Sequence, residues 1–437
     1  MAKMSMKKPD KGSLLCLGGS SEALEIIKHV KKLGYRPIIF DNRPDCPAAQ
    51  WAASFKQPKK YQTKRHEAVF LKADCYSSRS ILEIFIFAIR MPRRHNIDGG
   101  SYRGDDLRGV LCCGIDAPMV AADLAKHYHL PTLGEAAKWG VNKYEQIKQL
   151  DKAGIPIPLT KVINAEMSWS DVQDYDIVKP VDNRGSRGVR WYTNRDYQEA
   201  IVEASSHSKL RQVIGQTWLE GHQYSTESVV YNKRVIFTAI AERNYDRMDE
   251  FYPYIIEDGS SCPAELNADE TRAIVNVIEC SCAALEWDNL TVKGDLVIDP
   301  LTGTVSVIEL APRLSGGYFA SNIIPLAYGW DIVKEAVLIA TGQEPLLELN
   351  RVSDYICQRF VFPKPEWVGK HVKELPQPIG QDCEKLVWNF AKGDVVRPVK
   401  AHPDRLGMVL TTAATSQEAT RLANEIVSEL TEEIMVE

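Results

Sequence analysis

Apolar runs that alternate with helical patterns indicate a parallel α/β domain at the start of the chain. The apolar run 14–17 ends at Gly18-Gly19, as a buried strand does when it enters a glycine turn. Apolar residues then recur at helical spacing over 22–33. Further strand-like runs lie at 37–40 and 109–112, and a helical pattern covers 117–127. We expect a doubly wound parallel sheet in a domain spanning residues 1–130.

The remaining pattern predicts two further parts. Residues 131–349 begin with a helical stretch, 141–153, and continue with short strands and one helix (196–205) in a segment of about 155–220. Strand-like runs follow up to residue 309, with a helix at 269–285 among them and another at 330–341. Residues 350–437 show strand, loop, strand and a final helix (416–430), which predicts a small C-terminal α+β domain.

Composition narrows the class of protein. With 437 residues, the chain is long enough for about two to four domains. A formal charge of −5 gives no support to a nucleic-acid surface. The apolar stretch 81–89 is too short to cross a bilayer, the polar segment 92–108 is expected to be an exposed loop, and no signal-peptide pattern follows Met1. Ten cysteines without a CxxC pair favour reduced thiols in the cytoplasm.

Two acids in consecutive strand-like runs are the strongest chemical signal. The run 291–299 carries Asp295, the run 307–310 carries Glu309, and the turn formers Pro300–Gly303 between them predict a hairpin. Pairing of the strands would bring the two carboxylates together, where they would hold Mg²⁺ or Mn²⁺ against triphosphate oxygens. Arg313 would then lie beside the transferred phosphoryl group.

A glycine loop follows another strand-like run. Lys179 lies in the run 177–180, and Gly185, Ser186 and Gly188 lie in the polar loop after it. Backbone N–H groups at glycines approach phosphates closely, and the lysine adds a fixed cation. Walker A spacing is absent, and a plain hairpin turn is the alternative.

The segment 215–223 is a candidate for adenine binding. Its extended backbone would pair with the adenine edge, with Trp218 and Leu219 around the ring. By itself the segment is unremarkable.

The order of these pieces resembles the ATP-grasp superfamily. The resemblance covers nearly the whole chain, and it implies an ATP-grasp domain between an N-terminal α/β domain and a C-terminal α+β domain. It makes Lys143 and Lys179 the phosphate-binding lysines, 185–188 the lid loop of a lid subdomain at about 155–220, and Gln216 to Leu219 the adenine hinge. It makes Asp295 and Glu309 the metal ligands and Arg313 the phosphoryl-stabilising arginine. The tail is similar to the biotin carboxylase and carbamoyl-phosphate synthetase branch.

Three positions depart from the family pattern. Gln216 stands where the hinge usually begins with glutamate, and Gln223 replaces the ribose-binding acid, although its amide still hydrogen-bonds hydroxyls. Ala311 replaces an asparagine ligand found in many members, so the number of metal ions stays open. The Glu-Xaa-Xaa-Xaa-Arg form with alanine also resembles ATP-grasp amino-acid ligases.

The resemblance implies an ATP-dependent carboxylate–amine ligase acting on small molecules, with a homodimer common among such enzymes. Lys143, Lys179 and Arg313 would stabilise the transferring phosphoryl group. The run Ser315-Gly316-Gly317 would hold the acyl phosphate or the substrate carboxylate, or else is a flexible connection.

Other functions stay open at this stage. Bicarbonate activation of the biotin carboxylase or carbamoyl-phosphate synthetase kind is one alternative, and a non-catalytic ATP-binding regulator is another. Gly18-Gly19 with Asp41 echoes a dinucleotide site, but the full GxGxxG is missing. The charged loop 243–249, with Arg243 and Arg247, is a candidate for the second substrate or a solvated loop.

Overall fold

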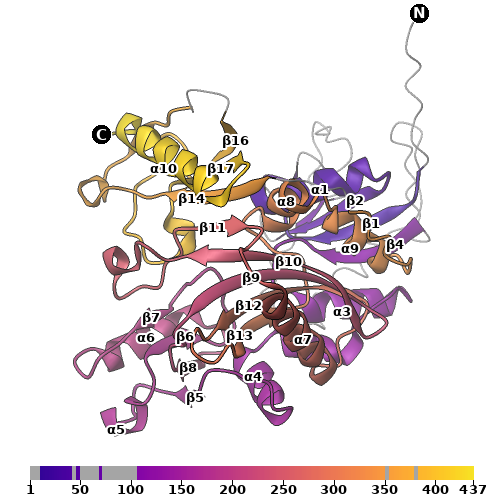
Figure 1. Ribbon diagram of the computed structural model, residues 1–437, viewed down its shortest axis with the longest axis horizontal. Helices are drawn as coiled ribbons and strands as arrows, with labels where there is room; N and C mark the ends of the chain where they lie inside the picture. The colour runs from indigo at the N-terminus through magenta and orange to yellow at the C-terminus, as the bar shows by residue number, and fades with distance from the viewer. Residues whose placement is uncertain (1–9, 42–45, 50–67, 71–105, 350–353, 378–381) are drawn as a thin grey trace, which may run out of the picture.

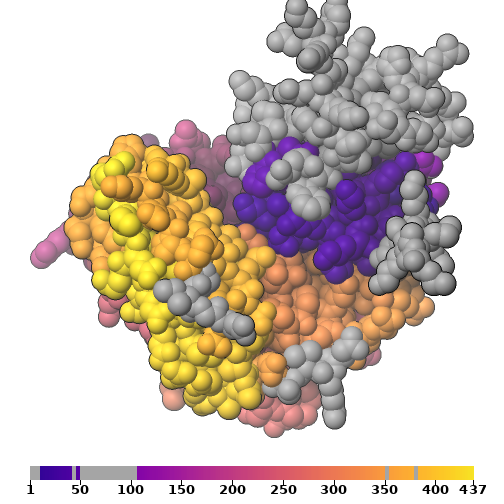
Figure 2. All heavy atoms as spheres, turned by 90° about the horizontal axis from the view of Figure 1, so that it is seen from above, coloured from indigo at the N-terminus to yellow at the C-terminus, as the bar shows by residue number. Residues whose placement is uncertain are grey.

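The computed structural model describes residues 10–41, 46–49, 68–70, 106–349, 354–377 and 382–437. The apolar stretch 81–89 and most of the expected loop 92–108 lie outside these residues. Figure 1 shows the N-terminal strands at the upper right, the C-terminal strands and α10 at the upper left, and the small lid sheet at the lower left, below the long strands β9 and β10. Seen from above, the C-terminal residues and the N-terminal residues flank the middle of the chain (Figure 2).

The N-terminal domain is a parallel sheet, as predicted. Its strand order is β3-β2-β1-β4, and every pair is parallel. Its elements are β1 (Ser13–Leu17), α1 (Ser21–Lys32), β2 (Arg36–Asp41), β3 (Ala68–Phe70), β4 (Leu107–Cys112) and α3 (Pro118–His127). The Gly19 N–H donates to the Asp41 carboxylate at 2.7 Å. Asp41, which with Gly18-Gly19 resembles part of a dinucleotide site, therefore hydrogen-bonds the glycine turn itself.

The central sheet has eight strands in the order β13-β12-β9-β10-β11-β14-β17-β16. The strands from the middle of the chain are β9 (His222–Tyr231), β10 (Arg234–Asn244), β11 (Gly259–Cys262), β12 (Leu290–Ile298) and β13 (Val305–Ala311). The antiparallel pairing of β12 with β13 confirms the predicted hairpin. Helices α7 (Ala268–Ala284), α8 (Ile324–Tyr328) and α9 (Ile332–Ala340) complete this part.

The lid is a separate four-stranded antiparallel sheet in the order β5-β8-β6-β7. Its elements are β5 (Thr160–Ile163), α5 (Trp169–Val172), β6 (Ile177–Pro180), β7 (Arg190–Trp191), α6 (Tyr197–His207) and β8 (Val213–Gln216). The short helix α5 was not expected, because a single turn leaves no periodicity to read. A capping box at Ser168 and Asp171 starts it.

The C-terminal strands extend the central sheet. Strand β14 pairs with β11, and β17 pairs with both β14 and β16. The C-terminal elements are β14 (Tyr355–Val361), β15 (Val372–Glu374), β16 (Cys383–Trp388), β17 (Gly407–Ala413), α10 (Ser416–Glu433) and β18 (Met435–Val436). The predicted α+β elements are therefore present, but most of their strands continue the sheet that carries the acid hairpin.

Helix α4 (Lys143–Lys152) fastens the acid hairpin to the rest of the molecule. Its buried Gln146 accepts a hydrogen bond from the Leu310 N–H at 2.9 Å and donates to the Leu310 carbonyl at 2.8 Å. The same amide donates to the Trp139 carbonyl at 2.9 Å. The side chain thus replaces a neighbouring strand at the free edge of β13, beside Glu309.

We expect Gln146→Ala to destabilise the protein by about 1–3 kcal/mol, because it leaves buried backbone groups of β13 without partners. Urea unfolding followed by circular dichroism measures this. The exposed Lys148 of the same helix supplies the control Lys148→Ala. Equal unfolding midpoints for the two variants would show that Gln146 does not hold the hairpin.

Candidate active site

Strand register brings the two predicted metal ligands together. Asp295 of β12 lies opposite Glu309 of β13 on one side and opposite Ser225 of β9 on the other. Because residues directly opposite each other share a face, both carboxylates point to the same side of the sheet. The other face carries Leu296 and Leu310, which are buried in an apolar cluster with α7.

Basic side chains hold both carboxylates. The Lys143 ammonium lies 3.1 Å from Glu309 Oε1 and donates to the carbonyl of Asn183 in the lid loop at 2.7 Å. Asp295 is ion-paired with Lys293, lies 3.5 Å from Arg243 Nη1, and accepts a hydrogen bond from the Ser225 hydroxyl at 3.1 Å.

Burial and charge oppose each other at Asp295. Burial by itself raises the pKa of this carboxyl, but Lys293 and Arg243 outweigh it and hold the pKa well below the usual range. Asp295 is therefore a carboxylate at neutral pH. Its charge is balanced by neighbouring cations, which is the arrangement that a charged oxygen ligand needs in a buried site.

Lys179 completes a group of cations around the hairpin. It is buried in β6, and burial lowers its pKa to about 8, against the opposing effect of Glu309 and with a further lowering by Lys143. Two lysines from different elements therefore converge on Glu309. They are the pair that the sequence predicts for phosphate oxygens.

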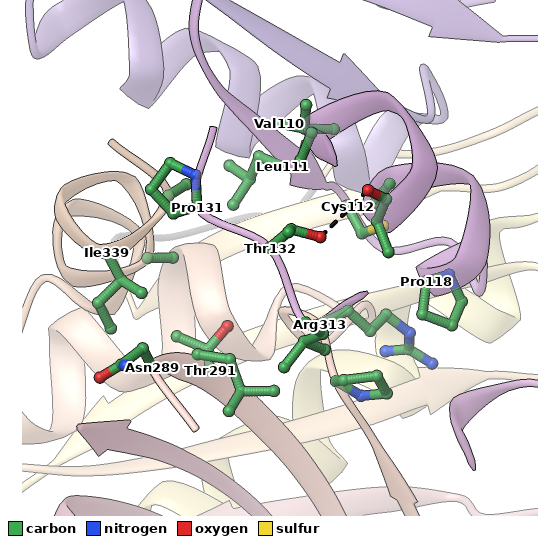
Figure 3. Close-up of a pocket in the computed structure, with 18 of the residues that line it drawn as sticks. Val110, Leu111, Cys112, Pro118, Pro131, Thr132, Asn289, Thr291, Arg313 and Ile339 are labelled. Atoms are coloured by element: carbon green, nitrogen blue, oxygen red, sulfur yellow. Dashed lines mark hydrogen bonds between the residues drawn. The ribbon is translucent and has the colours of Figure 1, made fainter. Parts of the chain in front are cut away.

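Arg313 reaches the N-terminal domain. Its guanidinium is ion-paired with Asp116, in the loop before α3, and it holds the pKa of that carboxyl well below the usual range against the effect of burial. Arg313 also lies at the edge of a cavity of about 110 Å³ between the N-terminal domain and the start of β12. Figure 3 shows its side chain extending towards Pro118 along this cavity. No role was predicted for Asp116 from the sequence.

The lid loop is held from two sides. Gly185 and Gly188 have positive φ angles of 65° and 72°, which favour glycine. The Ser186 hydroxyl is hydrogen-bonded to His402 Nε2 at 3.1 Å, and the His402 N–H donates to the Gly185 carbonyl at 3.0 Å. On the other side, Arg184 donates to the Gly114 carbonyl at 2.9 Å. The sequence analysis missed His402, which comes from the C-terminal domain.

The residues of the predicted adenine hinge lie in two different surroundings. Trp218 and Leu219 line a cavity of about 350 Å³ together with Val297 and Ser306 of the acid hairpin. Gln216 does not line it. Its buried side chain donates to the Thr160 hydroxyl at 2.9 Å inside the lid sheet.

Gln223 lies on the site face of the central sheet. It is buried on β9 directly opposite Val297, two residues along β12 from Asp295. Its partner Val297 lines the hinge cavity, so Gln223 lies beside that cavity on the face of the acid pair.

Glu227 is a buried acid that the sequence analysis did not single out. It lies on β9 opposite Lys293, on the same face as Asp295. Its Oε2 accepts the Ser315 N–H at 2.8 Å, and its Oε1 has no hydrogen-bond partner. Burial raises the pKa of this carboxyl to about 7, with Ser315 acting in the opposite direction. The spacing Gln223, Ser225, Glu227 on one strand was the signal that could have found it.

The run Ser315-Gly316-Gly317 is an ordered turn. Glu227 holds its first residue, and the Gly317 carbonyl accepts a hydrogen bond from Gln358 at 3.0 Å. The backbone of Gly316 lies against the Glu22 carboxylate of α1, which would have to move to admit a Cβ. These contacts place the turn between β13, the C-terminal domain and the N-terminal domain.

The charged segment 243–249, predicted as a loop, begins within β10, which contains Arg243. Arg243 points into the site, where it also lies 3.1 Å from Glu257. Arg247 turns away and pairs with Glu250 at the surface. Among the described residues, no group of three histidine, cysteine or acidic side chains is placed to bind a metal. Nor does any described helix combine the length and apolarity needed to cross a membrane.

Two family models match the chain. Residues 141–317 match the ATP-grasp domain, and residues 380–434 match the L-amino acid ligase C-terminal domain 2. No curated protein sequence matches.

Solved structures match over almost the whole chain. The L-amino acid ligase from Bacillus licheniformis is 17% identical with a TM-score of 0.69, and the match covers 98% of this chain and 99% of that one. Phosphoribosylglycinamide synthetase from Anaerococcus prevotii is 16% identical with a TM-score of 0.68, covering 98% and 100%. The biotin carboxylase domain of the Hydrogenobacter thermophilus 2-oxoglutarate carboxylase is 13% identical with a TM-score of 0.66, covering 98% and 91%.

Fold, element order and family matches agree with one another. The acid hairpin, the two lysines and the lid loop all lie within the residues that match the ATP-grasp domain. Residues 141–317 thus form an ATP-grasp domain, and residues 380–434 match the C-terminal domain 2 of L-amino acid ligases.

Proposed function

We propose that this protein is an ATP-dependent ligase that activates a small carboxylate as an acyl phosphate and joins it to an amine. The observation that carries the proposal is the pair Asp295 and Glu309, held on one sheet face beside Lys143 and Lys179. A site that gathers cations around two carboxylates is suited to a triphosphate and its metal ion.

ATP would lie between the lid and the central sheet. Its adenine would occupy the cavity lined by Trp218 and Leu219, and Gln223 would hydrogen-bond the ribose. Lys143 and Lys179 would contact phosphate oxygens. The loop with Gly185, Ser186 and Gly188 would cover them.

Asp295 and Glu309 fit a hard divalent cation such as Mg²⁺ or Mn²⁺. Both are oxygen ligands, they lie side by side, and in this structure each has a cation as its partner. When bound, the metal ion supplies charge neutralisation at the phosphate oxygens.

In the first half-reaction, a carboxylate oxygen of the substrate attacks the γ-phosphorus and ADP leaves. Lys143, Lys179 and Arg313 stabilise the charge that spreads over the transferring phosphoryl oxygens. The ion pair with Asp116 fixes the direction of the Arg313 guanidinium. The N-terminal domain thereby takes part in the phosphoryl-transfer site.

In the second half-reaction, an amine attacks the acyl carbon and phosphate leaves, forming an amide. Water must be excluded, because it would hydrolyse the acyl phosphate. The closed lid loop, bonded to both flanking domains through Arg184 and His402, supports this exclusion. Backbone N–H groups of the ordered turn Ser315-Gly316-Gly317 are suited to hold the acyl phosphate.

Amino acids are the substrate class that we favour. The match of residues 380–434 to the L-amino acid ligase domain supports them over bicarbonate. A screen of ADP release over pairs of L-amino acids, hydroxy acids and amines tests the proposal. The expected result is ADP release that depends on both partners, and release that ignores them would contradict a ligase.

We expect Glu309→Gln to lower ATP-dependent ligation by about 100-fold or more, because it removes one of two charged metal ligands. ADP release in the presence of both substrates measures the loss, and circular dichroism checks the fold. Glu265→Gln makes the same change at an exposed position and serves as the control. Near-normal turnover in Glu309→Gln would place the metal site elsewhere.

We expect Lys179→Ala to raise the KM for ATP by about 10-fold to 100-fold, which corresponds to the loss of one charged hydrogen bond to phosphate. Steady-state kinetics at varied ATP concentrations measure this. The exposed lid residue Lys161, changed to alanine, should leave the KM unaltered. An unchanged KM in Lys179→Ala would argue against the assigned nucleotide orientation.

A further inference from the structure

We propose that Glu227 accepts the proton that the attacking amine loses before it forms the amide bond. The inference rests on the proposed function and assigns a residue to its second half-reaction. Nothing in the first half-reaction uses this side chain.

The position of Glu227 places it next to the phosphoryl-transfer groups. It lies two residues along β9 from Ser225, which contacts Asp295, so the two sites are roughly 7 Å apart on one face. Lys293 lies opposite Glu227, and the turn that follows Arg313 passes over it. Glu227 therefore borders the place where the acyl phosphate would be made.

One oxygen of the Glu227 carboxylate accepts a hydrogen bond, and the other has no partner. Its Oε2 is held by the Ser315 N–H, whereas Oε1 and the Ser315 hydroxyl complete no hydrogen bond although both are buried. The hydroxyl is still near enough to lower the pKa of the carboxyl. Buried polar atoms without partners are rare in proteins, and the unpaired acceptor Oε1 beside a hydroxyl fits a ligand with N–H donors. An ammonium group or amine has that chemistry.

The proton balance of the second half-reaction calls for such a group. An amine substrate is an ammonium ion near neutral pH and has no lone pair until it loses a proton. Glu227 takes this proton, the nitrogen attacks the acyl carbon, and the carbon–oxygen bond to phosphate breaks. The nitrogen loses its second proton to the departing phosphate, and Glu227 releases its own to solvent when the products leave.

The environment of the side chain suits this task. Burial raises the pKa of Glu227 to about 7, while Arg313 and Lys293, the charged groups that face it, prevent a larger rise. A base whose pKa lies near the working pH is the most effective proton acceptor. On this basis the amide-forming rate should fall as the pH drops below about 7.

Glu227→Gln separates the two half-reactions when hydroxylamine replaces the amine. Hydroxylamine is largely uncharged at pH 7, so it attacks an acyl phosphate without first losing a proton. With each standard L-amino acid as the acyl donor, hydroxamate formation in Glu227→Gln should stay within about threefold of the unmodified protein. Amide formation with an amino-acid amine should fall by about 100-fold or more.

Two outcomes would overturn the assignment. Equal losses of hydroxamate and amide would mean that Glu227 only positions the turn at Ser315, and an unchanged amide rate would mean that it accepts no proton. Absence of hydroxamate with every acyl donor in the unmodified protein would instead refute the proposed ligase. Glu242→Gln, on the neighbouring strand with its side chain on the opposite face, is the matched control.

Thermal unfolding shows whether the variant folds. Because the pKa of Glu227 is raised from 4.5 to about 7, the folded state binds this proton more tightly than the unfolded state does. Ionisation therefore costs stability as the pH rises through this range. The glutamine variant cannot ionise, so its unfolding temperature at pH 8 should equal or exceed that of the unmodified protein.

Discussion

The site depends on the register of three antiparallel strands. Asp295 and Glu309 share a face only because β12 and β13 pair as they do, and a slip of one residue would turn one of them into the apolar cluster under α7. Two features fix the register. The pairing shifts between Asp295 and Leu296, and Gln146 bonds both backbone groups of Leu310 at the edge. The helix that carries Lys143, for which we propose phosphate binding, thus also holds the strand of Glu309, the proposed metal ligand, in place.

The same face collects charges of both signs, and each of the two hairpin carboxylates has a cation beside it. Asp295 is balanced by Lys293 and Arg243, and Glu309 is balanced by Lys143. Burying these carboxylates alone would cost far more than their contacts return. A metal ion and a polyphosphate would exchange partners within this set: the cations would turn to phosphate oxygens, and the acids would turn to the metal. No net charge would then be left unpaired.

Local sequence was enough for part of this site and not for the rest. The hairpin, the glycine loop and the lysines at element ends were predictable, because each is marked by residues close together in the chain. The contacts of Asp116 with Arg313 and of His402 with Ser186 join segments about 200 residues apart, and no periodicity records them. Gln216 was predicted to lie on the adenine hinge, but its side chain hydrogen-bonds Thr160 within the lid sheet. The C-terminal strands looked like a separate unit, because sheet continuity across β11 and β14 has no local signal.

In the mechanism that we propose, the sheet face also separates the two half-reactions in space. Phosphoryl transfer needs fixed positive charge and ionised carboxylates, and Asp295 meets this need because its neighbours keep its pKa low. Amide formation needs a group that changes its protonation state, and Glu227 meets that need because burial dominates over its cationic neighbours. The two acids lie on adjacent strands of one face. The difference between them comes from their partners: Asp295 has two basic side chains in contact, whereas Glu227 is held by Ser315. One strand arrangement therefore supplies a permanent charge and a proton acceptor side by side.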